Sequence, residues 1–224
     1  MSPPREKGFV IVVVLLGIVL LSAVGSALVL TTTTETRIAA YFRYSGEALA
    51  AAEAVAELSL ADVAAVPDWD RLLDGSVASR FVDGPPIGPR KLADGSAIDL
   101  AQVVTMANCE KPAPCTDADM DVVTDDRPWG ANNPRWKLFA HGWLRDVLPP
   151  GAIDSPFYVV LMVGDDPAEN DNDPTTDGRD AANPGSGVVA LRAEAFGPGA
   201  HRTVELTVAR TLGTVRILTW REVR

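Results

Sequence analysis

The stretch that decides the fold is residues 5–37, REKGFVIVVVLLGIVLLSAVGSALVLTTTTETR. It begins with a charged segment, and the run from Phe9 to Leu30 then carries no formal charge. A helix rises about 1.5 Å per residue, so this run is about 33 Å long and matches the hydrocarbon core of a bilayer. We therefore expect a transmembrane helix over residues 9–30.

A secretory signal peptide is the alternative for the same stretch. The apolar core of a signal peptide usually has about 7–15 residues and ends at a cleavage site of small residues, which Gly25-Ser26-Ala27 imitates. The apolar run here is longer than that, which favours a membrane span. The leader before the span is too short to fold, so we expect the large C-terminal part to lie on the exoplasmic side of the membrane.

The composition narrows the range of partners. The 224 residues include 20 Lys and Arg against 30 Asp and Glu, which gives a net charge of −10. The field of such a protein repels phosphate groups. We therefore expect no nucleic acid as a partner.

A helical pattern continues beyond the apolar run, over residues 31–66, and Pro67 ends it. Alanine dominates residues 48–56, which favours a helix with a smooth packing surface. Small and apolar residues recur at intervals of three or four. They are Ile38, Phe42, Ser45, Leu49, Ala52, Ala56 and Val63. We expect an amphipathic continuation of the N-terminal helix, with a juxtamembrane stalk or a coiled coil as the alternative.

Two segments near the N-terminus resemble PilX-type minor pilins of the type IV pilus. They are KGFVIVVVLLGIVLL at residues 7–21 and ETRIAAYFRYSGEALAAAEAVAEL at residues 35–58. The resemblance implies that a prepilin peptidase removes the leader, residues 1–8, by cutting between Gly8 and Phe9, and methylates Phe9. It also implies that the protein is anchored in the inner membrane, that its helix binds other pilins or minor pilins, and that it reaches the pilus at the cell surface.

One position departs from the pattern of most major pilins, which carry a glutamate as the fifth residue of the mature chain. The fifth residue after the expected cut is Val13. In the fibre this glutamate is thought to pair with the terminal amine of a neighbouring subunit, because an unpaired charge is costly in an apolar environment. The K-type pseudopilin of type II secretion also lacks it and lies at a filament tip. By resemblance, Val13 therefore indicates a rare priming or tip subunit.

The pattern of residues 67–224 is typical of an antiparallel sheet, so the fold class that we expect is α+β and pilin-like. Turn signals such as Asp74-Gly75 separate apolar runs. The predicted strands are residues 98–106, 136–144, 157–163, 187–196, 201–210 and 214–220. GPGA joins the fourth and fifth of these strands as a hairpin. One face of the sheet needs a cover, and the apolar stripe of the helix is the predicted one.

The chain has two cysteines, Cys109 and Cys115, which enclose the segment CEKPAPC. Cysteines of a domain outside the cytoplasm usually form disulfides, so we expect a bond between them. Free thiols are the alternative if the topology is reversed. A zinc site is not indicated, because His141 and His201 are too distant in sequence to match a ligand spacing.

An acidic segment at residues 165–180 suggests a calcium site. Crowded carboxylates repel one another, and Ca²⁺ relieves this repulsion through oxygen ligands. The candidate ligands are Asp165, Asp166, Asp171, Asp173 and Asp177. The spacing departs from the EF-hand loop, because Pro184 stands where the bidentate glutamate is required. A solvated acidic surface loop is therefore the leading interpretation, and the calcium site is the alternative.

No catalytic motif is present in the sequence, neither a nucleophile elbow nor a phosphate-binding loop. We therefore expect a structural protein rather than an enzyme, with no cofactor besides the candidate calcium ion. The leading interpretation is a minor pilin that takes part in type IV pilus assembly. The alternatives are a K-like pseudopilin of type II secretion and a membrane-anchored exoplasmic binding domain with no role in a filament.

Overall fold

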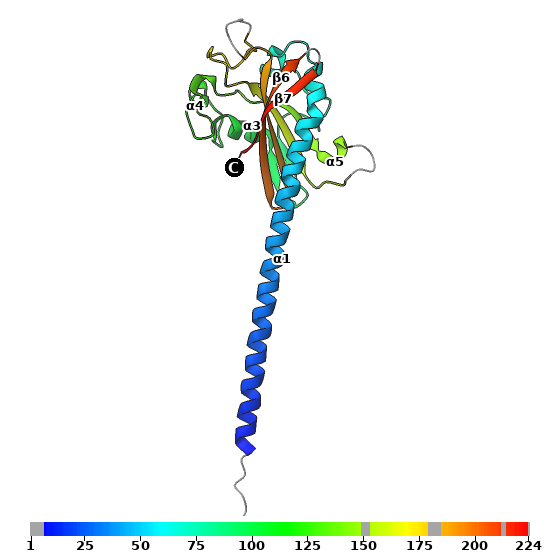
Figure 1. Ribbon diagram of the computed structural model, residues 1–224, viewed down its shortest axis with the longest axis vertical. Coiled ribbons are helices and arrows are strands. Elements are labelled where there is room, and N and C mark those ends of the chain that lie inside the picture. Colours follow the sequence, from blue (N-terminus) through cyan, green and yellow to red (C-terminus); the bar gives the residue numbers. More distant parts are fainter. Residues whose placement is uncertain (1–6, 149–152, 179–184, 212–213, 224) are drawn as a thin grey trace, which may run out of the picture. The chain divides into compact units, whose positions relative to one another are not determined.

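The computed structural model describes residues 7–148, 153–178, 185–211 and 214–223 (Figure 1). The chain divides into two compact units, Met1–Arg43 and Tyr44–Arg224. The longest element, helix α1 (Lys7–Ala65), contributes to both units.

The described part of the first unit is helical throughout. Every large apolar side chain of residues 9–30 is exposed by half or more. Ile38 and Phe42, which were expected on the buried stripe, are 50% and 70% exposed. The predicted stripe is therefore wrong at its N-terminal end, because these two side chains lie outside the folded core.

A five-stranded antiparallel sheet forms the centre of the second unit, and each strand pairs with the next one along the chain. The strands are β3 (Lys137–Trp143), β4 (Tyr158–Asp165), β5 (Val188–Gly197), β6 (Ala200–Thr211) and β7 (Thr214–Val223). The last five predicted strands are thereby confirmed, and so is the hairpin between β5 and β6. Every residue of β4 is buried, which explains its continuous apolar run.

One face of the sheet is covered by the part of α1 that belongs to the second unit. The helix makes this contact with small side chains, since Ala48, Ala52 and Val55 are fully buried. They share one core cluster with strand residues such as Leu161 and Leu191. Alanine lets the helix backbone approach the strands closely, so the apolar face of the sheet is sealed from water. The predicted cover of the sheet is confirmed.

The other face of the sheet is covered by helix α3 (Leu100–Cys109). Beside α3 lies a two-stranded ribbon of β1 (Pro89–Lys91) and β2 (Ala97–Asp99). The short helices of the described chain are α2 (Asp70–Leu73), α4 (Asp117–Met120), a 3-10 helix (Gly130–Asn132) and α5 (Leu144–Val147). The sheet is thus enclosed between two helical layers.

The strand predicted over residues 98–106 is wrong beyond its second residue. The carboxylate of Asp99 accepts a hydrogen bond from the backbone N–H of Gln102 at 3.1 Å and caps the first turn of α3. Leu100, Val103 and Ala107 then follow at helical spacing and are buried. The cap and the spacing together outweigh the β propensity of the valines and threonine in this run.

Replacing Ala52 by leucine should destabilise the second unit by about 1–3 kcal/mol, because the larger side chain must be forced between α1 and the sheet. Leucine and alanine have similar helix propensities, so the change acts through packing. The matched control is Ala50→Leu at an exposed position of the same helix, which should change the stability by less than about 0.5 kcal/mol. Denaturant unfolding of the full chain in detergent micelles, followed by tryptophan fluorescence, compares the two variants. Equal losses would contradict this account of the packing.

Candidate functional site

The first candidate site is the exposed apolar surface of α1 at residues 9–30, here named the apolar segment. In the described part of the chain, α1 is the one helix that is long and apolar enough to cross a membrane. The expected processing position, between Gly8 and Phe9, lies at the start of this helix. The apolar segment is therefore compatible with a single-pass membrane anchor.

Threonines follow the apolar segment directly, and their hydroxyls are satisfied inside the helix. The hydroxyl of Thr31 donates to the carbonyl oxygen of Ala27 at 3.0 Å, and that of Thr33 donates to Val29 at 2.8 Å. The same bond, four residues back, is made by Thr32, Thr34 and Thr36. Because these donors need no outside partner, this turn of the helix can enter an apolar environment at little cost.

Cys109 and Cys115 form a disulfide bond, as predicted. Cys109 is the last residue of α3, and Glu110 reverses the chain with a φ of 56°. The two Cα atoms are then 6.2 Å apart. The bond fixes the end of α3, and because the loop that it closes is short, its entropic contribution is about 2 kcal/mol.

The acidic segment after β4 is not uniformly solvated. Asp171 and Asp173 are exposed, as expected for a surface loop. Asp165, Asp166 and Glu169 are buried instead. The interpretation as a solvated loop is therefore wrong for these three carboxyl groups, which lie at the end of β4 and directly after it.

Backbone groups hold this segment closed over Glu169. The carboxylate of Glu169 accepts a hydrogen bond from the N–H of Gly178 at 3.1 Å, and Asp177 accepts one from Gly187 at 2.6 Å. A Cβ atom at Gly185 would lie 1.9 Å from the Cγ of Glu169. A glycine is therefore required where the chain passes over this side chain.

Asp165 and Glu169 form a pair of buried carboxyl groups. Among the described residues, the Oδ1 of Asp165 and the Oε1 of Glu169 have no hydrogen-bond partner. Burial and, after it, the nearby charge of Glu169 raise the pKa of Asp165 to about 9. Burial also raises the pKa of Glu169. Asp165 therefore holds a proton at neutral pH.

Within the described residues, no three His, Cys, Asp or Glu side chains are grouped so that they could hold a metal ion. Asp180, the last carboxylate of the acidic segment, lies outside the described residues. Calcium at Asp165, Asp166, Asp171, Asp173 and Asp177 remains a prediction. An ion at this position would have to draw its ligands together from the loop as it binds.

Both histidines have structural partners. His141 is buried in β3, and its Nδ1 lies 3.2 Å from the hydroxyl oxygen of Tyr158. Burial lowers the pKa of His141, so its ring is neutral at pH 7. The Nε2 of His201 lies 2.9 Å from the carboxylate of Glu194, which also accepts a hydrogen bond from Arg192 at 2.7 Å. Each ring therefore contacts a side chain of the neighbouring strand.

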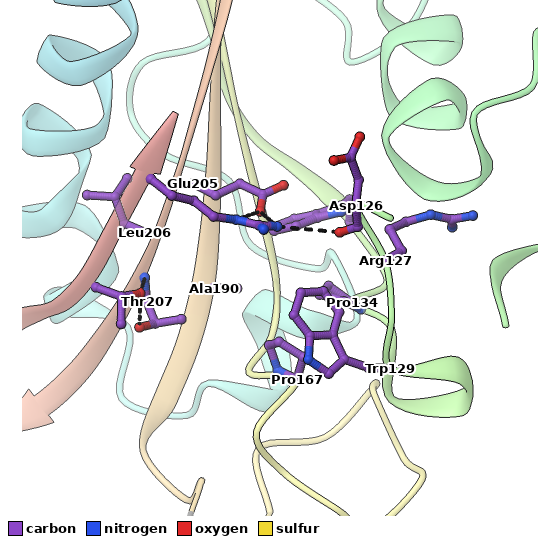
Figure 2. A pocket seen from close by; sticks show the side chains of 12 residues that line it. Asp126, Arg127, Trp129, Pro134, Pro167, Ala190, Glu205, Leu206 and Thr207 are labelled. Atoms are coloured by element: carbon purple, nitrogen blue, oxygen red, sulfur yellow. Dashed lines mark hydrogen bonds and ion pairs between the residues drawn. The ribbon is translucent and has the colours of Figure 1, made fainter. Parts of the chain in front are cut away.

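A pocket of about 280 Å³ lies on the sheet face that carries α3, and we name it the tryptophan pocket (Figure 2). Trp129, Pro134 and Pro167 gather on one side of it. Arg221 donates a hydrogen bond to Glu205 at 2.9 Å, and its guanidinium lies 5.8 Å from the Trp129 ring. The sequence patterns did not reveal this pocket, because its residues come from segments far apart in the chain. The richness in tryptophan was the one available signal.

Residues 7–57 match the family model described as PilX N-terminal. The match covers the apolar segment and most of the helix that follows, so the chain carries a PilX-type pilin N-terminal segment. The resemblance expected for this region is confirmed. The match does not extend to the sheet. No curated protein and no solved structure gave a significant match.

The buried carboxyl group of Asp165 should make the second unit less stable as the pH rises. An aspartate of the unfolded chain ionises near pH 3.9, whereas Asp165 in the folded chain keeps its proton up to about pH 9. Between these values the folded state binds more protons, so the free energy of unfolding falls with rising pH. Asp165→Asn cannot ionise, and relative to the wild type it should gain at least about 1 kcal/mol between pH 5 and pH 8.

Urea unfolding of the full chain in micelles, with a calcium chelator present, measures this difference. Asp125→Asn is the control, because Asp125 is exposed, and it should follow the wild type at both pH values. The same pH dependence in Asp165→Asn and in the wild type would contradict the assignment. Calcium in place of the chelator tests the metal prediction, since an ion held by Asp165 would stabilise the wild type and not Asp165→Asn.

Proposed function

We propose that the chain is a minor pilin that takes part in the assembly of a type IV pilus. Before assembly, the apolar segment crosses the inner membrane and the second unit lies on the exoplasmic side. The PilX-type N-terminal segment supports this proposal, and so does the α+β domain whose sheet is covered by α1. The role is structural rather than catalytic.

The exposure of the apolar segment is the observation that carries the proposal. None of the large apolar side chains of residues 9–30 is buried within the chain. Such a surface is unfavourable in water, by about 25 cal/mol per Å² of apolar area, and requires lipid or other apolar helices around it. The internally bonded threonines beside it would let the same helix leave the bilayer for a bundle of other pilins.

Val13 supports a place at the tip of the fibre or in a priming complex. Its side chain is 51% exposed and presents only methyl groups where, by resemblance, most major pilins present a carboxylate. Val13 cannot neutralise the terminal amine of a neighbour, and an unpaired charge in an apolar bundle is costly. A subunit without a neighbour ahead of it would not need that contact.

A K-like pseudopilin of type II secretion is the second candidate, and Val13 is the observation that favours it. A pseudopilin would have the same leader and the same apolar helix as a minor pilin, and it would also be cut by the prepilin peptidase. Deletion of the gene separates the two, since the first role predicts loss of pili and the second predicts loss of secretion. A membrane-anchored binding domain would require neither effect.

The mature protein should begin at Phe9 and carry a methyl group on its terminal nitrogen. Mass spectrometry of the N-terminal peptide measures this directly. Gly8→Leu should block the cut, because the resemblance places a glycine immediately before it. The control is Gly17→Leu, whose new side chain meets open space in the chain and should leave processing intact. A mature terminus at Leu28 would indicate a signal peptide and contradict the pilin proposal.

The protein should be far scarcer than the major pilin in sheared fibres, and its deletion should strongly reduce the number of fibres. Val13→Glu should increase its share in the fibres, because the new carboxylate can pair with the terminal amine of a neighbour. Val14→Glu is the control, since it places the same charge one residue away. Quantitative immunoblots of sheared fibres compare the two variants.

Two outcomes would count against the tip position. One is a wild-type protein present in the shaft at nearly the same amount as the major pilin. The other is normal piliation after deletion of the gene. An equal effect of the two glutamate variants would show that the fifth position has no special role.

A further inference from the structure

The two edges of the five-stranded sheet differ. The outer edge of β3 is covered by a neighbouring segment, because the N–H of Ser79 donates to the carbonyl of Phe139 at 2.8 Å and that of Asp83 donates to His141 at 2.9 Å. At the other edge, the sheet ends with β7, and no described segment pairs with its outer side. Most residues of β7 are exposed. An edge of this kind presents unpaired N–H and carbonyl groups that can accept a further strand.

A hollow lies beside β7 on each face of the sheet. On the face that carries α3, Thr219 and Arg221 line the tryptophan pocket. On the face covered by α1, Ile217 and Trp220 line a groove of about 350 Å³. Successive side chains of an added strand point to opposite faces, so they would reach these two hollows alternately.

The groove on the α1 side has both apolar and acidic walls, and we name it the glutamate groove. Ile217 and Trp220 are 39% and 47% exposed in it. Glu53 and Glu57, one helical turn apart on α1, form its other wall. Neither carboxylate makes an ion pair with a described residue. A lysine or arginine side chain fits this groove, since it can meet the carboxylates with its charge and the indole with its stem.

The tryptophan pocket favours a different side chain. Two of its charged residues, Glu205 and Arg221, are already hydrogen-bonded to each other, and Glu205 also accepts a hydrogen bond from Arg192. What it offers an incoming group is the apolar surface of Trp129, Pro134 and Pro167. An aromatic or aliphatic side chain is therefore the matching occupant.

We infer that β7 is a docking edge for an extended segment of another protein in which basic and apolar residues alternate. The main chain of this segment pairs with Thr219–Val223, its basic side chains enter the glutamate groove, and its apolar side chains enter the tryptophan pocket. Main-chain bonds supply affinity in strand addition, and the pockets supply specificity. The net charge of −10 also favours a basic partner. The inference goes beyond the proposed pilin role and does not depend on processing of the N-terminus.

A second copy of the chain is a poorer occupant. Thr207 pairs with Thr219 and Val208 pairs with Ile217, so Leu218 is an extra residue that makes a bulge in β7. Bulged edge strands pair poorly with one another, and two chains of the same negative charge repel. The regular stretch beyond the bulge, Thr219–Val223, remains free to accept an unbulged strand of a different protein.

The experiment uses the purified full chain in detergent micelles and a fluorescent hexapeptide of alternating lysine and phenylalanine. Fluorescence anisotropy should show saturable binding. Two further peptides carry N-methyl groups on either the lysines or the phenylalanines, so each has one edge blocked. One of them should bind at least tenfold more weakly and the other within twofold of the parent, because a single edge of the strand faces β7.

The variant Glu53→Gln/Glu57→Gln tests the groove and should weaken binding about fivefold. Its control, Asp117→Asn/Asp125→Asn, removes two exposed carboxylates outside the groove and should stay within twofold. Three results would overturn the inference. They are the absence of saturable binding, equal affinities of the two methylated peptides, and a dimer of the chain that the hexapeptide dissociates, which would assign the edge to a second copy. Normal or failed pilus assembly does not alter this readout.

Discussion

Helix α1 carries two different surfaces along one unbroken run of backbone hydrogen bonds, and the other elements of the fold depend on how these surfaces are arranged. Residues 9–30 present large β-branched and aliphatic side chains on all sides, and none of them finds a partner in the chain's own core. From Ala48 to Val63 the contact side chains are small, and the same helix becomes a wall of a close-packed core. The two parts of α1 differ more in the volume of their side chains than in their hydrophobicity. Large side chains on all sides of a helix can pack against lipid or against a bundle of other helices. Alanine side chains instead allow close contact with one surface, which here is the sheet.

The two faces of the sheet differ, because only one of them packs against α1. The face toward α1 is apolar and closely packed, as Leu161, Leu191 and Val204 show by their complete burial. The opposite face combines an apolar cluster under α3 with a chain of ion pairs in which Arg192 joins Glu194 to Glu205. A half-buried arginine between two carboxylates is tolerated because all three groups are bonded. Apolar packing therefore stabilises one face of the sheet, and charged hydrogen bonds add to the apolar cluster on the other.

The elements with a strong local periodicity were predictable from the sequence. The continuous apolar run of β4, the β5–β6 hairpin around Gly199 and the alanine-rich helix all follow from patterns within a short window. Helix α3 was not predictable in this way, because its valines favour a strand and the cap at Asp99 stabilises a helix instead. The pairing of Cys109 with Cys115 was predictable because no other cysteine competes. The buried state of Asp165 was not predictable, since an acidic run gives no sign of which carboxylate the fold covers.

The tryptophan pocket could not be predicted for a similar reason, because Trp129 and Arg221 are far apart in the sequence and meet only in the folded domain. Within the described residues, the strand order leaves the sheet with one covered edge, at β3, and one open edge, at β7. Such a sheet can pair with one further strand, at β7. Its other edge is covered and cannot pair with a second strand. Strand pairing through this domain would thus end a series of contacts and could not propagate along it.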